Sequence, residues 1–400
     1  MKLGGGAHLT YCSNIHPGES WAEVRTNFSR HVLAVRDQLR PEGRLGIGLR
    51  LSARAAAELA EPAALAEFLG FLGRERLYVF TLNAFPYGPF HGQRVKDEVY
   101  LPDWRDEERL RYTNQAADLM AALLPADEPA LEGSVSTVPG AFKAALRGPA
   151  DAAAMADLML RHVVHLVALR ARTGRTVTLA LEPEPACFIE TVDEALAFFK
   201  QHLHSDSAAK RVTELSGMDV DAARVALRLH LGLCLDLCHA AVEFEDAAAC
   251  IRQLRDAGIR ITKMQISAGL RLPTLDAEAL AALRRFDDPV YLHQVVQRGP
   301  QGLRRFSDLP EAFASLDDDR ATLEWRVHFH VPIFLERLAP FVSTQAFVRE
   351  VLALQRQQAV SAHLEVETYT WAVLPEPFRS GPVEAAIARE LDWVRAELAA

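Results

Sequence analysis

The stretch LGLCLDLCHA, at residues 231–240, places an acid and a histidine at the end of an apolar run. Such a near-continuous hydrophobic run is typical of a strand that is buried on both faces. An unpaired carboxylate is too costly to bury inside that strand, so we expect Asp236 at its carboxyl end and His239 on the turn that follows. There the two side chains could share a metal ion or a substrate hydroxyl. Asp236 could instead cap the next helix.

Further polar side chains end other strand candidates. Glu182 closes TVTLAL, Gln265 lies in IRITKMQI, and Glu365 and Glu367 alternate in HLEVETYT. Residues two apart share a strand face, so one of these glutamates is expected at a metal and the other one layer deeper. Oxygen ligands favour Mg²⁺ or Mn²⁺, and added histidines favour Mn²⁺, Co²⁺ or Zn²⁺. We therefore expect one or more divalent ions held by residues from this set: Glu182, Asp236, His239, Gln265, His330 and Glu367.

Each of these residues also has a purely structural interpretation. Glu182 could be a solvated side chain where prolines stop the strand, and Gln265 could be a hydrogen-bonding core residue. His328 and His330 share a strand face, which suits metal ligation, but they could equally lie on an exposed ribbon. The acidic run at residues 317–319 is expected on a solvated face.

The elements that would position these residues alternate between strand and helix. Strand candidates lie at residues 7–13, 45–51, 77–83, 133–138, 176–182, 229–235, 259–266 and 362–369. Eight such units predict an α/β fold, a (β/α)8 TIM barrel in one domain over residues 1–400. A doubly wound open sheet is the alternative, although no GxGxxG follows the first strand. Residues 268–342 are expected to be a mostly irregular insertion between strands seven and eight, at the barrel mouth.

Several residues beside these strand ends are expected to contact the substrate. A polar and aromatic loop of about twenty residues spans positions 84–104. Loops of about this length without regular structure are usually functional in compact domains. In this loop, His91 and Lys96 could close over a substrate and exclude water. Asn14 and His16 follow the first strand and, with His239, complete the predicted substrate-binding set.

Composition limits the classes of partner. A net charge of −9 argues against a nucleic-acid binder, which needs a basic face. No apolar run approaches a membrane span, and no signal peptide is visible at the amino terminus. The five scattered cysteines suit a reducing compartment. We expect a cytoplasmic protein without membrane insertion whose partner is a small-molecule metabolite.

The motifs resemble known families. The set of Glu182, Asp236-x-x-His239, Gln265 and Glu367 resembles the metal quartet of xylose-isomerase-like barrels, the sugar phosphate isomerase/epimerase superfamily. The stretch HFH at residues 328–330 falls where the endonuclease IV branch has an aspartate and a histidine between strands seven and eight. Here His328 stands in place of that aspartate. The stretches TYCSNIHPGESW, FPYGPFHG, VKDEVYLPDW and HLEVETYTWAVLP resemble the metabolite traffic protein EboE family. That resemblance implies a barrel in a secondary-metabolite precursor pathway, with other proteins of that pathway as partners.

Three functions are compatible with these patterns. In the first, a metal-dependent sugar (phosphate) isomerase or epimerase acts on a polyhydroxylated metabolite. Glu182 and Glu367 then move a proton at carbon through a metal-stabilised enediolate. In the second, the barrel binds a metabolite and hands it to partners without converting it. The third, an endonuclease-IV-like phosphodiesterase, is disfavoured by the acidic net charge and by His328.

Overall fold

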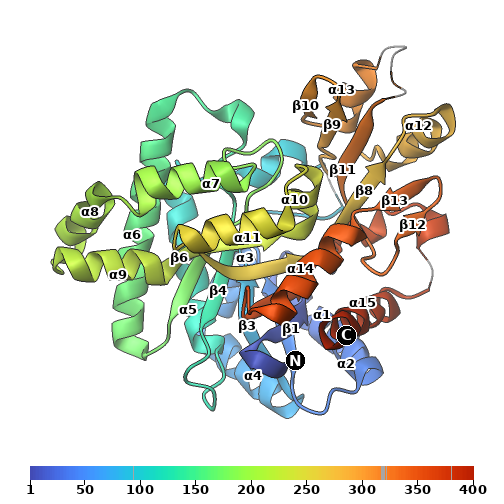
Figure 1. The fold of residues 1–400 in the computed structure, drawn as a ribbon. Helices are drawn as coiled ribbons and strands as arrows, with labels where there is room; N and C mark the ends of the chain where they lie inside the picture. The colour runs from blue at the N-terminus through green and yellow to red at the C-terminus, as the bar shows by residue number, and fades with distance from the viewer. Residues whose placement is uncertain (93, 317–319, 321, 380) are drawn as a thin grey trace.

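The centre of the molecule is a sheet of eight parallel strands (Figure 1). The computed structural model describes residues 1–92, 94–316, 320, 322–379 and 381–400. In sheet order β1-β14-β7-β6-β5-β4-β3-β2, the strands follow one another around a barrel. Their bounds are β1 His8–Tyr11, β2 Leu45–Arg50, β3 Leu77–Asn83, β4 Gly133–Thr137, β5 Val177–Leu181, β6 Leu231–Asp236, β7 Arg260–Ile266 and β14 His363–Val366.

The sheet closes where β1 meets β2. A parallel bridge joins Cys12 to Gly48, and the Thr10 hydroxyl donates to the Gly46 carbonyl (2.7 Å) and accepts from the Gly48 amide (2.8 Å). Each predicted strand lies within a few residues of an observed one. Strands that are buried on both faces consist of continuous apolar residues, so they can be recognised in the sequence. The predicted α/β TIM barrel is therefore confirmed.

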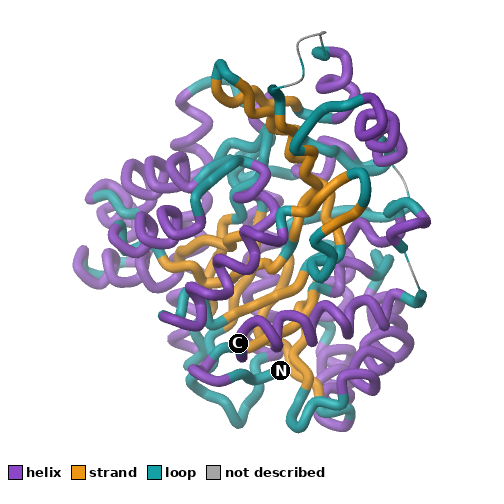
Figure 2. The backbone as a smooth tube through the Cα atoms, turned by 45° about the vertical axis from the view of Figure 1, so that its right-hand side comes forward, coloured by secondary structure: helices purple, strands orange, loops and turns teal. Residues whose placement is uncertain are grey.

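Helices form a layer around the barrel (Figure 2). Two of them contain π-helical turns, η3 (Phe28–Val32) and η6 (Phe199–Leu203). The longer helices are α1 Trp21–Asn27, α2 Leu33–Leu39, α3 Ala53–Leu59, α4 Pro62–Arg74, α5 Glu107–Leu123, α6 Pro149–Thr173, α7 Val192–Phe198, α8 Asp206–Ser216, α9 Val220–His230, α10 Leu237–Val242, α11 Ala247–Asp256, α12 Ala277–Leu283, α13 Leu309–Ala314, α14 Gln345–Gln357 and α15 Val383–Ala399. The 3-10 turns are η1 Gly4–Gly6, η2 Ser13–Ile15, η4 Lys96–Tyr100, η5 Lys143–Ala145, η7 Arg284–Phe286, η8 Tyr369–Ala372 and η9 Glu376–Phe378.

Helix α6 is, among the described residues, the one helix long and apolar enough to cross a membrane. Its most apolar part is 50% buried inside the fold. On its polar side Arg161 donates to Glu107 of α5 (2.8 Å), and His165 lies 3.0 Å from Asp118. These contacts are those of a helix packed in the outer layer of a barrel.

The segment between β7 and β14 forms an ordered lobe, not the mostly irregular insertion that the sequence predicts. A six-stranded antiparallel sheet runs in the order β10-β9-β11-β8-β13-β12, with α12 and α13 beside it (Figure 1). Most of its strands are short and partly exposed, so they lack the continuous apolar run that marks the barrel strands. The acidic run at residues 317–319 lies outside the described residues. The strands are β8 Ala268–Leu272, β9 Val295–Gly299, β10 Gly302–Phe306, β11 Glu324–Val331, β12 Arg337–Leu338 and β13 Phe341–Ser343.

Two features join this lobe to the barrel mouth. A single residue, Ser267, separates the end of β7 from the start of β8, so the lobe continues directly from a barrel strand. In β11 the pairing with β8 is regular up to Val327 and resumes at Val331, with a register shift between them. Such irregularities change the direction in which side chains point. His328 and His330 lie within this interval.

Candidate metal centre

Three acids from separate strands meet at the carboxyl-terminal mouth of the barrel. Asp236 is the last residue of β6, Glu182 directly follows β5, and Glu367 directly follows β14. All three side chains are buried, and each offers an oxygen within 4.8 Å of the others. The parallel barrel thus gathers, from distant parts of the chain, oxygen ligands of the kind that divalent cations prefer.

The electrostatics of these acids fit a cation. Burial raises the pKa of Glu182 and of Glu367 well above the usual range, and neighbouring carboxylates raise both further. Burial also acts to raise the pKa of Asp236, but His239, His330 and hydrogen bonds hold it below its usual range. Oε2 of Glu182 and Oδ2 of Asp236 have no hydrogen-bond partner. Because buried, unpartnered carboxylate oxygens are costly, this donor set fits a divalent metal ion.

Two histidines bring nitrogen donors to the same acids. The His239 amide donates to Oδ1 of Asp236 (2.9 Å), so Asp236 does cap the helix that follows it, α10. Nε2 of His239 lies 3.8 Å from Oδ1 of Asp236, and Nε2 of His330 lies 4.0 Å from Oδ2. The capping and metal-binding interpretations of Asp236 are therefore compatible with each other.

Gln265 reaches the acids less directly. Its Oε1 accepts a hydrogen bond from the Cys234 thiol (2.9 Å), and its buried Nε2 has no partner. An amide nitrogen is a hydrogen-bond donor, so only the oxygen could ligate a cation. In this structure that oxygen faces the thiol, and the role of Gln265 as a metal ligand stays a prediction.

Glu365 is the deeper glutamate of the alternating pair. Its Oε1 lies 2.6 Å from Nζ of Lys263, and both side chains are fully buried. Gly48 leaves room for it, because a Cβ at that position would lie 1.7 Å from Oε2 of Glu365. Oε1 of Glu367 accepts a hydrogen bond from Asn14 (2.7 Å) at the mouth. Glu367 is therefore the glutamate that faces the acid cluster.

A cavity of about 60 Å³ lies over the cluster. Space of this size holds a few water molecules, since each needs about 10–15 Å³ of such volume. The aromatic rings of Phe90, Tyr291 and Tyr369 line it and pack on one another, with ring centres 5.2 to 5.3 Å apart. The polar side chains that face it include Asn14, Glu182, Glu184, His239, His328 and Glu367.

The residues after the first strand and on the long loop that are predicted to contact substrate differ in whether they line the cavity. Asn14 lines the cavity, whereas His91 and His16 are not among the described residues that line it. His91 donates from Nε2 to the Asn14 carbonyl (2.6 Å) and so supports Asn14. His16 stacks on His31, with ring centres 4.4 Å apart, and bonds to the Tyr11 hydroxyl (3.2 Å). His16, which follows the η2 turn, thus packs on other side chains, and its role in substrate binding stays a prediction.

Lys96 lines the cavity but is already paired. Its Nζ lies 2.7 Å from Oδ2 of Asp308 and donates to the Asp288 carbonyl (3.1 Å). The Val95 and Lys96 amides both donate to the Val290 carbonyl (2.9 Å each). These bonds join the loop after β3 to the lobe. We call these two segments, which line one side of the cavity, its roof.

Glu184 is a site residue that the sequence patterns do not single out. It is buried, lines the cavity, and accepts a hydrogen bond from the Tyr100 hydroxyl (2.7 Å). Together with His239 and His328 it offers three ligand atoms within 4.8 Å of one another. The available signal was its place as the second glutamate of EPEP, two residues after Glu182.

Comparisons with known proteins settle the fold. No family model matches the chain, and no curated protein matches it. The chain is similar to the solved structure of a xylose isomerase-like TIM barrel protein from Mycobacterium smegmatis in complex with magnesium. That match has a TM-score of 0.50 and 12% identity, over 100% of this chain and 98% of that one. This likeness agrees with the TIM-barrel fold of the chain.

Two further solved structures are similar at lower scores. One is a D-tagatose 3-epimerase-like protein, with a TM-score of 0.48 and 11% identity over 98% of this chain and 97% of that one. The other is the IOLI protein with a zinc atom, with a TM-score of 0.46 and 11% identity over 98% and 97%. In TIM barrels the chemistry occurs at the carboxyl-terminal mouth. The acid and histidine cluster of this chain lies at that mouth.

Proposed function

We propose that this barrel is a divalent-metal-dependent isomerase or epimerase that acts on a small polyhydroxylated metabolite. One observation carries the proposal: Glu182 and Glu367 both line the cavity, and each has an oxygen within 4.8 Å of Asp236. Their strands, β5 and β14, are separated in the barrel by β6 and β7. The two glutamates therefore approach a bound molecule from different sides.

That arrangement suits the transfer of a proton at carbon. A divalent cation at the acids would act as a Lewis acid toward substrate oxygens. Glu182, whose Oε2 has no partner, takes the proton from one face. Glu367, held at Oε1 by Asn14 (2.7 Å) and Asn83 (3.3 Å), returns it from the other. Burial and the neighbouring carboxylates raise the pKa of both groups, which makes each ionised carboxylate a stronger proton acceptor.

The cavity favours an uncharged substrate over a sugar phosphate. Lys96 is the only lysine or arginine among the described lining residues, and Asp308 already neutralises it. Glu182, Glu184 and Glu367 all face the same space, so a phosphate dianion would be repelled. The same charges and the roof weigh against phosphodiester hydrolysis. Aromatic rings on the roof side suit the apolar face of a sugar or cyclitol.

Exchange with solvent deuterium tests this function. The metal-loaded chain is incubated in heavy water with a panel of unphosphorylated sugars and cyclitols, and each is analysed by mass spectrometry. We expect one deuterium at carbon in at least one compound, and none with the Glu182→Gln variant. Full exchange in that variant would overturn the assignment of Glu182.

A second candidate is a metabolite-binding barrel without catalysis, in a trafficking pathway such as the resemblance to EboE implies. The pair of Lys96 and Asp308 supports it, because it joins the loop after β3 to the lobe beside the cavity. In that case a ligand co-purifies with the chain, and no compound exchanges carbon-bound hydrogen. Other proteins of that pathway would then be its partners.

A further inference from the structure

Two polar atoms that the cavity wall leaves without a partner are hydrogen-bond acceptors. Oδ1 of Asn14 and Oε2 of Glu182 are buried, and neither receives a hydrogen bond. The direction of the Asn14 amide is fixed, because its Nδ2 donates to Oε1 of Glu367 (2.7 Å). The neighbouring amide of Asn83 is fully used, since it donates to Glu367 (3.3 Å) and accepts from the Phe85 amide (3.1 Å). A molecule that satisfies the two free atoms must therefore bring hydrogen-bond donors.

Glu184 offers a third free acceptor. Its Oε1 accepts a hydrogen bond from the Tyr100 hydroxyl (2.7 Å) and a longer one from Nε2 of Gln294 (3.4 Å). Within the described part of the chain, no donor bonds to its Oε2. The side chain is buried and lines the cavity. The protein thus holds one oxygen of this carboxylate and leaves the other for a ligand.

The two donors to Glu184 are themselves held in place. The ring of Tyr100 stacks on that of Phe142, with ring centres 5.1 Å apart, which positions the hydroxyl. Nε2 of Gln294 also donates to the Pro185 carbonyl (3.1 Å), on the residue after Glu184. The carboxylate is therefore fixed before any ligand binds, and a fixed charge binds its partner without the cost of ordering.

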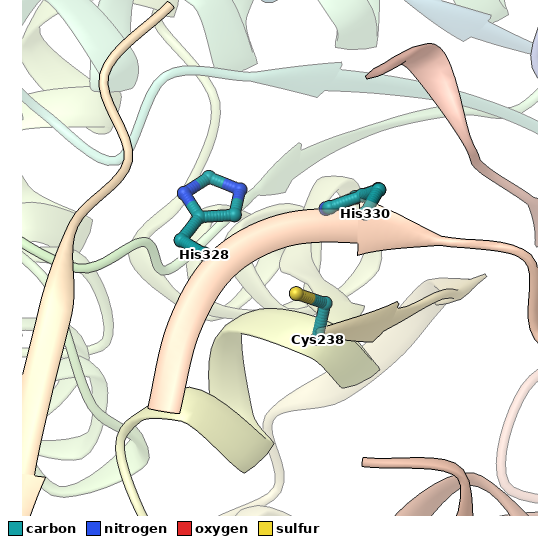
Figure 3. Close-up of side chains that lie close together, drawn as sticks. All are labelled: Cys238, His328 and His330. Carbon is teal, nitrogen blue, oxygen red and sulfur yellow. The ribbon is translucent and has the colours of Figure 1, made fainter. Parts of the chain in front are cut away.

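The lobe sets the direction of the Gln294 amide. Oε1 of Gln294 lies 2.7 Å from Nδ1 of His328, so Nε2 faces Glu184. Figure 3 shows His328 and His330 side by side on β11, with Cys238 of α10 beneath them. The lobe residues in the described lining of the cavity carry no ammonium or guanidinium group; they are Tyr291, Leu292 and His328.

The cavity wall stays negative even with a metal ion bound. A divalent ion offsets two of the three negative charges that the acid cluster carries when it is ionised. Glu184 adds a further carboxylate, and Lys96, the one lysine or arginine of the described lining, is neutralised by Asp308 (2.7 Å). A buried negative charge without a counterion is costly. A positive group on the bound molecule removes that cost.

The aromatic rings of the wall favour the same kind of group. Phe90, Tyr291 and Tyr369 line the cavity together with the carboxylates. The faces of aromatic rings attract ammonium ions. An ammonium group also has three donors and no acceptor, which matches the free acceptors of Asn14 and Glu184.

We propose that the substrate carries a protonated primary amine beside its hydroxyl groups, as amino sugars and aminocyclitols do, and that Oε2 of Glu184 binds the ammonium. Glu184 then determines the specificity of the site, and Asn14 accepts a hydrogen bond from a neighbouring donor of the same molecule. The inference rests on the proposed function, because the polyhydroxylated substrate class is the same. It narrows that class from polyols without a phosphate to polyols with an amine.

Matched sets of ligands test this specificity. The full chain, loaded with Mn²⁺, is titrated by calorimetry at pH 6.5 with D-glucosamine, D-mannosamine and D-galactosamine. The corresponding hexoses and N-acetyl derivatives are the neutral counterparts. We expect at least one amine to bind about tenfold or more tightly than both of its counterparts, the size of a hydrogen bond to a charged group. Glu184→Gln should lose this preference. Glu390→Gln, a buried acid outside the described lining, is the matched control and should keep it.

Three results would overturn the proposal. The first is that no amine binds more tightly than its neutral counterparts, or that none binds at all. The second is a folded Glu184→Gln protein, checked by circular dichroism, that keeps the preference. The third is a loss of bound Mn²⁺ from that variant, measured by plasma mass spectrometry, which would make Glu184 a metal ligand. If Glu184→Gln does not fold, the wild-type preference decides alone.

The failure of this inference and that of the proposed function are distinguishable. A preference for amines without deuterium exchange at carbon would sink the proposed isomerase and leave the specificity standing. Deuterium exchange in neutral sugars, with no preference for amines, would do the reverse.

Discussion

The barrel and the lobe contribute different chemistry to one centre. The barrel supplies the carboxylates, Glu182, Asp236 and Glu367, from strand ends fixed by hydrogen bonds on both sides. The lobe supplies His328, His330 and part of the roof from a shifted stretch of β11. Parallel strands place all their carboxyl ends at one mouth of the barrel. The positions of the lobe residues depend instead on contacts across the seam, the boundary between the lobe and the barrel. The acids should therefore be the fixed half of the centre and the lobe the adjustable half.

The largest effect is expected from the fixed half. In the proposed function, Glu182→Gln removes the group that accepts the proton, at nearly constant volume. Exchange of carbon-bound hydrogen should fall roughly 100- to 10,000-fold, the usual contribution of a general base. The measurement is the deuterium incorporation rate at saturating substrate. Glu390→Gln, a buried acid outside the cavity, should leave the rate within about twofold.

The two regions also differ in how far the sequence predicts them. All eight barrel strands were predictable, because an apolar run such as LGLCLD is written by burial on both faces. Asp236 and Glu367 were predictable as strand-end acids for the same reason. The lobe was not, since strands such as β10, four of whose five residues are exposed, show no such run. The sequence also does not show that His16 stacks on His31, a contact between residues on separate elements.

Lys263 tests whether the barrel interior is as fixed as this contrast requires. It is fully buried, 2.6 Å from Glu365, and donates to Ser136 (3.1 Å). Lys263→Met leaves the carboxylate buried and unpaired, so the free energy of unfolding should fall by about 3–5 kcal/mol. Urea denaturation followed by circular dichroism measures this.

The double variant separates pairing from packing. Lys263→Met with Glu365→Gln removes both charges, and it should recover most of the stability lost by Lys263→Met. Arg54→Met, which breaks the exposed pair with Glu58, is the control and should leave the free energy of unfolding nearly unchanged. If Lys263→Met were as mild as Arg54→Met, the buried ion pair would not hold the barrel interior together.

Glu390 tests the seam between the two regions. Oε1 of Glu390 accepts from the Thr368 hydroxyl (2.7 Å), beside the end of β14, and from the Ile333 amide (3.1 Å) of the lobe. Burial raises the pKa of Glu390 from 4.5 to about 7. The folded chain therefore holds a proton that the unfolded chain releases between about pH 4.5 and 7. This contribution to stability is complete below pH 4.5 and is lost as pH rises through 7.

The expected size follows from the shift. The rise in the pKa of Glu390 from 4.5 to about 7 corresponds to about 3 kcal/mol in the free energy of unfolding. Glu390→Gln should remove this part of the pH dependence and make the chain more stable than wild type at pH 8. The measurement is the urea midpoint between pH 4.5 and 8 for both proteins. Parallel curves would show that Glu390 is not held protonated at the seam.

The smallest effect is expected at the roof, where the adjustable half meets the loop after β3. Asp308→Asn weakens the pair with Lys96, which is partly solvated and worth about 1 kcal/mol at most. Local opening should become up to about fivefold more frequent, so amide hydrogen exchange should accelerate at Val95 and Lys96, whose amides bond to Val290. Lys2→Met, which breaks the exposed pair of Lys2 with Glu128, is the control and should leave the exchange of those two amides unchanged. Equal acceleration in the barrel strands would mean that the loop, lobe and barrel open as one unit, and the division into a fixed and an adjustable half would not hold.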